Sequence, residues 1–136
     1  MSYAAGQALQ SALYLALTGD ADLQALVGGA IFDAPPPEGA PETYVTLGAE
    51  RVQARQDSAG AVIRHEVTIA VHSARAGFAT AKQVAGRIAD LLGEGPLSIA
   101  QGALVQLRFH KATASRVGSD GGRRIELIFR ALVDHA

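Results

Sequence analysis

Apolar residues stand at every second position in four segments of this sequence, and this alternation constrains the fold more than any other feature. It is clearest in residues 61–73, where polar residues separate the apolar ones, which are Ile63, Val67, Ile69 and Val71. Successive side chains of a β-strand point to opposite faces of a sheet. The pattern therefore predicts a strand with one buried face.

The four segments form two pairs. A polar link joins residues 43–52 to residues 61–73, and a glycine-rich link joins residues 102–116 to residues 123–133. Two hairpins are therefore expected. We expect one face of the first strand to carry Val45, Leu47 and Ala49, opposite Thr46, Gly48 and Glu50. The side chains expected to face inward in the second hairpin are Val105, Leu107, Phe109, Ile125, Leu127, Phe129, Ala131 and Val133.

Three other segments have helical spacing. Residues 2–17 carry leucine at every fourth position, which makes one apolar stripe. A short second helix is expected after Asp20, whose carboxylate can accept hydrogen bonds from the first free amides, and Gly28 ends it. Residues 77–92 return to the helical spacing.

The predicted order is α-α-β-β-α-β-β, in an α+β fold. A mostly antiparallel four-stranded sheet is formed by the two hairpins, with the helices packed on one face. The 136 residues fit a single domain, residues 1–136.

Composition excludes several classes of protein. There are 12 basic and 13 acidic residues, giving a net charge of −1, so no overall basic field marks a dedicated DNA- or RNA-binding domain. The absence of cysteine excludes disulfides and thiolate metal sites. No apolar run is long enough to cross a membrane and no basic leader is visible, so we expect a protein made in the bacterial cytoplasm.

The histidines do not suggest catalysis. His65 and His72 lie an odd number of residues apart on one predicted strand, so their side chains point to opposite faces and cannot share a metal ion. His110 is expected to face outward, and His135 is next to the end of the sequence. We predict no enzymatic activity, no cofactor and no metal. A small hydrolase or isomerase would instead require His65, Glu66 or His110 to converge in a pocket.

The last strand is apolar on both faces, because Ile128 and Leu132 lie opposite the inward set. Leu104, on the preceding strand, has the same ambiguity. Two interpretations are open. Either the first helix covers this second face, or Leu104, Ile128 and Leu132 contact a neighbouring subunit.

The tip of the first hairpin is polar and longer than a turn requires. It carries Arg51, Gln53 and Arg55, with little apolar anchorage. A solvated loop is the simplest interpretation. The alternative is a role in docking to a partner or in lining a channel.

The whole chain resembles the small tail-completion proteins of long-tailed phages, prophages and gene transfer agents, in particular the lambda-like tail terminator family. The resemblance rests on the leucine helix ending at Leu17 and on six segments in a fixed order. These are residues 20–28 (DADLQALVG), 31–33 (IFD), 35–37 (PPP), 41–48 (PETYVTLG), 67–73 (VTIAVHS) and 128–130 (IFR). The chain departs from the family at His72, where members often carry an aromatic residue.

The resemblance implies a structural role with no active site. It implies a hexameric ring on the last ring of the tail tube, which stops polymerisation and presents a docking surface to the head-completion or stopper protein of the connector. DNA would pass through the ring without sequence-specific binding, and a near-neutral net charge suits such a channel. The alternative within the same kind of particle is a head-to-tail stopper or adaptor.

Overall fold

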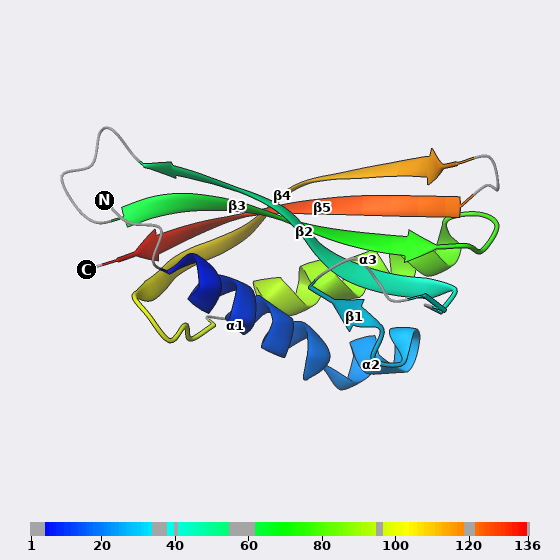
Figure 1. Ribbon diagram of the computed structural model, residues 1–136, viewed down its shortest axis with the longest axis horizontal. Coiled ribbons are helices and arrows are strands. Elements are labelled where there is room, and N and C mark those ends of the chain that lie inside the picture. The colour runs from blue at the N-terminus through cyan, green and yellow to red at the C-terminus, as the bar shows by residue number, and fades with distance from the viewer. Residues whose placement is uncertain are drawn as a thin grey trace.

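The computed structural model describes residues 5–33, 38–39, 41–54, 62–94, 97–118 and 122–135. These residues form a twisted sheet with the helices packed on one side (Figure 1). The elements are α1 (Gly6–Thr18), α2 (Ala21–Val27), β1 (Ile31–Phe32), β2 (Thr43–Ala54), β3 (Val62–Ser73), α3 (Ala79–Gly93), β4 (Ala103–Val117) and β5 (Gly122–Asp134). The predicted α+β class is therefore confirmed.

The sheet has five strands in the order β1-β2-β3-β5-β4. Both predicted hairpins are present, and β3 pairs with β5 to join them into one antiparallel sheet. The four-strand prediction missed β1, a two-residue strand that pairs parallel to β2 through Ile31 and Val45. Two residues are too few to show an alternating pattern, which is why the sequence did not reveal it.

The central pair of strands has an unbroken register. Every residue from Val62 to Ser73 on β3 has a partner on β5, from Asp134 back to Arg123. Odd-numbered residues of both strands therefore face the helices, and even-numbered residues lie on the opposite face, which we call the open face. The inward set predicted for the last strand is buried as expected, namely Ile125, Leu127, Phe129, Ala131 and Val133.

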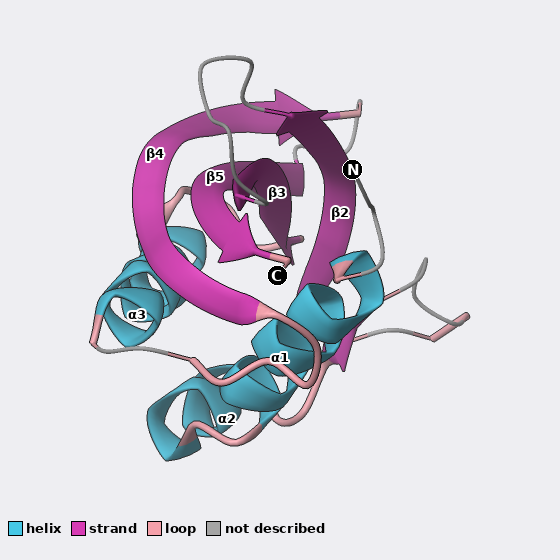
Figure 2. Cartoon of the chain, turned by 90° about the vertical axis from the view of Figure 1, so that its left-hand side faces the viewer, coloured by secondary structure: helices cyan, strands magenta, loops and turns pink. Residues whose placement is uncertain are grey.

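The helices complete the core on one side only, as Figure 1 shows. Leu9, Leu13 and Leu17 of α1 are buried in the same cluster as Ile69 and Phe129 of the sheet. In the end-on view of Figure 2, β4 lies at one side of the twisted sheet with α3 beside its lower part. The helical layer therefore covers one face of the sheet and leaves the open face without a helix.

An ion pair ties α2 to α3. Asp20 caps α2 by accepting a 2.9 Å hydrogen bond from the Leu23 amide, as the sequence predicted. The guanidinium of Arg87 on α3 binds both oxygens of this carboxylate, at 2.9 and 2.7 Å. This hydrogen bonding lowers the pKa of Asp20 and raises that of Arg87. Gly28 then ends α2 with a φ of 60°, a conformation that glycine adopts without steric cost.

Alanine substitutions at the cross-strand pair Phe109 and Phe129 test where the core ends. Phe129 is 1% exposed and Phe109 is 51% exposed, although their rings contact edge to face. We predict that Phe129→Ala lowers the free energy of unfolding by about 3 to 5 kcal/mol because it leaves a cavity. Phe109→Ala is the matched control and should cost only about 1 kcal/mol, the contribution of an aromatic edge contact. Urea denaturation of both variants measures the difference, and equal losses would contradict this assignment of the core.

Candidate functional site

The strand β4 carries the most exposed apolar side chains of the sheet. Val105 is 60% exposed and Phe109 is 51% exposed. The described segments place β4 at one edge of the sheet. Phe109, Ala112 and Ala114 are the cross-strand partners of Phe129, Leu127 and Ile125, so they lie on the helix-covered face of the sheet. All three are nevertheless exposed, because the helical layer does not extend over this part of β4.

Two register shifts in β4 change which of its side chains face the core, compared with the prediction from the sequence. Val105 is an extra residue between the paired positions Leu104 and Gln106, and it points into solvent rather than inward. Leu104 consequently pairs with Val133 and packs, partly buried, against the core. Leu107 faces the core as predicted. A bulge adds one residue to the strand, so the residues beyond it face the opposite side from the one that strict alternation from Leu104 predicts.

Ile128 and Leu132 lie on the open face and are partly buried. The interpretation in which the first helix covers them is wrong, since the buried leucines of α1 join the core on the other side of the sheet. The cross-strand neighbours of these two residues are long side chains: Lys111 beside Ile128, and Arg64 beside Leu132. Aliphatic stems of such side chains cover apolar neighbours while their charged ends stay in water. A contact of Ile128 and Leu132 with a second subunit stays a prediction.

A register shift in β2 moves Glu50 and Arg51 to unexpected faces. Leu47 pairs with Ile69, but Glu50 pairs with Val67, so one extra residue lies between them. Glu50 therefore faces the helices rather than the polar side that the alternation predicted, and Ala49 is exposed. Arg51 then falls opposite Glu66 on the open face. The bulge thus places a basic side chain on the face without helices.

The hairpin tip is partly described. Arg51 and Gln53 lie near the end of β2, opposite Glu66 and Arg64 of β3, and both are exposed. Arg55 lies outside the described residues. The predicted docking or channel-lining role of Arg51, Gln53 and Arg55 stays a prediction, although the structure adds that the first two share the open face with charged residues of β3.

His65 is fully buried and makes two contacts that the sequence did not suggest. Its Nδ1 lies 3.3 Å from a carboxylate oxygen of Glu50, and its Nε2 lies 3.4 Å from Nε2 of His135. His65 and His72 lie on opposite faces as predicted. Glu66 is on the open face and His110 is exposed on β4, so the structure does not bring together the residues that a hydrolase or isomerase would need.

His72 stacks on Tyr44 at the other end of the open face, with ring centroids 4.6 Å apart. Its Nε2 lies 3.0 Å from the hydroxyl oxygen of Thr46. Partial burial and the nearby charge of Arg124 lower the pKa of His72. His135 also has a lowered pKa, because of burial and the neighbouring His65. Both rings are therefore held in the neutral form near neutral pH.

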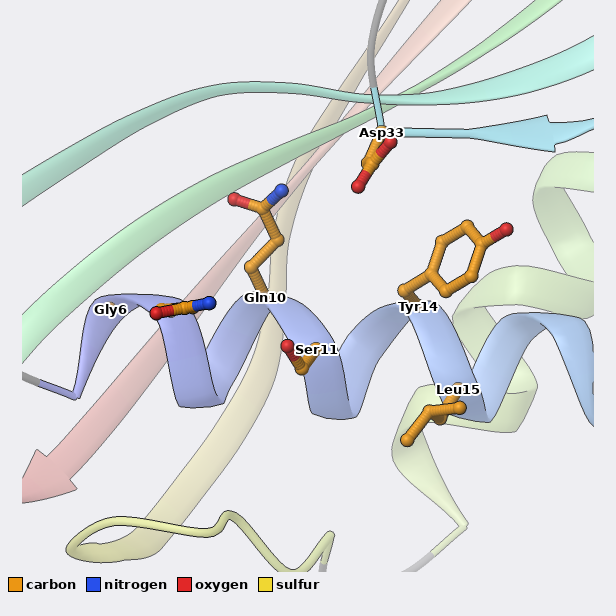
Figure 3. A pocket seen from close by; sticks show the side chains of 7 residues that line it. Gly6, Gln10, Ser11, Tyr14, Leu15 and Asp33 are labelled. Carbon is orange, nitrogen blue, oxygen red and sulfur yellow. The ribbon is translucent and has the colours of Figure 1, made fainter.

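A hollow of about 470 Å³ lies beside α1. Figure 3 shows Gln10 and Tyr14 of the helix on one side of it and Asp33 across from them. Its described lining residues are Gly6, Gln7, Gln10, Ser11, Tyr14, Leu15 and Asp33. Asp33 is the one carboxylate among these described lining residues, and no described histidine or lysine lines the hollow with it to form an acid–base pair.

Two features are absent from the described residues. No group of three or more His, Asp or Glu side chains in these segments is arranged to hold a metal ion. None of the helices in the same segments is long and apolar enough to span a membrane.

Comparison with known proteins identifies the family. The model of the family described as tail completion protein gp17 matches residues 11–134, nearly the whole chain. The chain belongs to the tail completion protein gp17 family. A chain in a solved structure described as "Virion of native gene transfer agent (GTA) particle" is 47% identical to it, with a TM-score of 0.90, over 98% of this chain and 99% of that one. None of the curated proteins compared with it is similar.

This tail completion protein has two candidate functional surfaces. One is the exposed strip of β4, which carries Val105 and Phe109, and the other is the open face of the sheet. The predicted resemblance to tail-completion proteins is confirmed.

His72 and His135 make the stability of the folded protein depend on pH. Their pKa values in the folded protein lie below the ordinary value of 6.5, so the unfolded chain binds protons more readily near and below that pH. Stability should therefore fall as the pH drops from about 7 to about 5. We predict that His72→Gln combined with His135→Gln reduces this pH dependence, as measured by urea denaturation at several pH values. An unchanged slope in the double variant would contradict the assignment.

Proposed function

We propose that this protein is the tail terminator of a phage-like particle, and that it acts by shape and assembly without catalysis. The observation that carries this proposal is the 47% identity over nearly the full length of both chains with a component of a gene transfer agent virion. Copies of the protein would form a ring, hexameric by the family resemblance, on the last ring of the tail tube. The ring would end polymerisation of the tube.

Ring formation requires heterologous contacts, in which two different surfaces of each subunit meet. We place one of these surfaces on the exposed strip of β4, centred on Phe109 and Val105. Large apolar side chains that are half exposed in a monomer are typical anchors of a subunit contact. Leu104 borders this strip. The surface of the neighbouring copy that receives it would lie on the other side of the subunit.

The remaining surfaces would serve the other partners. One end of the ring would meet the tail tube protein and the other the head-completion or stopper protein of the connector, with DNA passing through the ring. The end of β2 that carries Arg51 and Gln53, together with Arg55 in the following segment, would serve docking or lining of the channel. Assembly would begin in the bacterial cytoplasm and leave the protein at the head-proximal end of the tail. The alternative role in the same particle is a head-to-tail stopper or adaptor.

Particles produced without the protein separate these two roles. Loss of a terminator should give overlong or ragged tails that are not joined to heads, because nothing ends polymerisation of the tube. Loss of a stopper should give tails of normal length beside heads that leak DNA. Negative-stain electron microscopy of tail length, with DNA quantified in the purified heads, distinguishes the outcomes. Tails of normal length would contradict the terminator proposal.

The subunit contact could lie on the exposed strip of β4 or on the open face of the sheet, and one pair of variants distinguishes the two locations. We expect Phe109→Asp to prevent ring formation while leaving the monomer folded, because the side chain is half exposed. Ile128→Asp places the same charge on the open face, at the location that the sequence suggested. Native mass spectrometry or particle incorporation reports ring formation, and circular dichroism reports folding.

The outcome assigns the contact to one face. If only Phe109→Asp blocks the ring, the contact lies on β4. If Ile128→Asp blocks it and Phe109→Asp does not, the neighbouring subunit covers the open face and our placement is wrong.

A further inference from the structure

Charge is distributed unevenly over this nearly neutral chain. The register places six basic residues on the open face, namely Arg51, Arg64, Arg108, Lys111, Arg124 and Arg130. The acidic residues on the same face are Glu66, Glu126 and Asp134. The open face thus has a net charge of 6 − 3 = +3, while the whole chain has −1. The rest of the molecule carries the compensating negative charge.

Three of the six basic residues lie in one row that crosses four strands. Arg51 on β2 is opposite Glu66 on β3, Glu66 is opposite Arg130 on β5, and Arg130 is opposite Arg108 on β4. Arg130 lies 3.3 Å from the Glu66 carboxylate. Two arginines directly opposite each other on neighbouring strands repel and destabilise a sheet. An anion placed over Arg108 and Arg130 would relieve that repulsion.

Four of these basic side chains have no acidic partner within the described part of the chain. Arg51, Arg64, Arg108 and Lys111 make no ion pair there, whereas Arg130 pairs with Glu66 and Arg124 lies 3.8 Å from Glu126. Arg51 and Lys111 are among the exposed residues. Their charges are available to an external anion.

The apolar content of this face does not suit a protein partner. Ile128 and Leu132 are only partly exposed and lie on either side of Arg130 along β5. Protein interfaces are centred on apolar or aromatic anchors with few charges at the centre. The most exposed large apolar side chains of this sheet, Val105 and Phe109, lie on β4 outside the charged row, and Val117, which is 38% exposed, lies on the open face at the far end of β4.

We propose that the open face lines the channel of the ring and contacts the phosphate backbone of double-stranded DNA. This inference rests on the proposed ring function and names the surface of each subunit that meets the DNA. Arginine and lysine contacts to phosphates are independent of sequence, and they allow a protein to slide along the duplex. Glu66 and Glu126 moderate the attraction, so the face guides a moving polyanion without holding it at one site.

Binding of the full-length protein to a short DNA duplex of mixed sequence tests this proposal. The test variant is Arg108→Gln with Lys111→Gln, and the matched control is Arg116→Gln with Lys82→Gln. Both remove one arginine and one lysine. Arg116 is on β4 like Arg108, but it pairs with Arg123 and so lies on the helix-covered face, and Lys82 is on α3. Fluorescence anisotropy at several salt concentrations gives the slope of log affinity against log salt.

The test variant should lower that slope by at most about two, since each lost phosphate contact removes roughly 0.9. The control variant should leave the slope unchanged, and exchanging A·T for G·C pairs should leave the affinity unchanged. The proposal is overturned if the wild-type chain does not bind DNA at low salt, or if the control lowers the slope as much as the test variant.

Particles carrying the test variant separate this inference from the proposed function. Capped tails of normal length with reduced DNA delivery would support a channel-lining role for the open face. Overlong tails, or tails detached from heads, would show that the face contacts a protein during assembly, and the DNA proposal would be overturned while the terminator role stands. Failure of the terminator role itself is seen separately, as normal tail length in particles that lack the protein altogether.

Discussion

The unbroken antiparallel pairing of β3 with β5 is the constraint on which the rest of the structure depends. It joins two hairpins into one sheet, and its regular register assigns every side chain of both strands to one of two faces. One face carries the apolar residues that α1 and α3 cover. The other face carries most of the charged and hydroxyl-bearing residues of these strands, together with Ile128 and Leu132. The division between a buried core and a surface available to partners follows from this pairing, because a shift of one residue would exchange the two faces.

Regular segments were predictable from the sequence and irregular ones were not. The buried sets of β3 and β5, the leucine stripe of α1 and the cap at Asp20 follow from periodicity and hydrogen-bonding chemistry that act within a few residues. The bulges in β2 and β4 depend on how a strand fits its neighbour, which no local pattern records. They explain why Glu50 turned inward and Val105 turned outward. The contact between His65 and His135 was equally inaccessible, since the two residues are far apart in the sequence and meet only through the sheet.

The candidate functional surfaces were likewise predictable in part from the sequence. The polar character of the open face was predictable from the alternating pattern for β3 but not for β5, which was predicted to be apolar on both faces. Its charged row was not, because Arg51, Arg108 and Arg130 come from three strands and only their register aligns them. The exposed position of Phe109 was also missed, because the sequence cannot tell how far a helix extends over a strand. A near-zero net charge likewise concealed an asymmetric distribution between two faces.

The irregularities of β4 limit how copies of this protein can associate through the edge of the sheet. A long, flat edge strand would invite other copies to add to it indefinitely through main-chain hydrogen bonds. The extra residues Val105 and His110 interrupt the even spacing of donors and acceptors along β4, and Arg108 and Lys111 place like charges beside that edge. Open-ended stacking of copies through the edge of the sheet is thereby disfavoured.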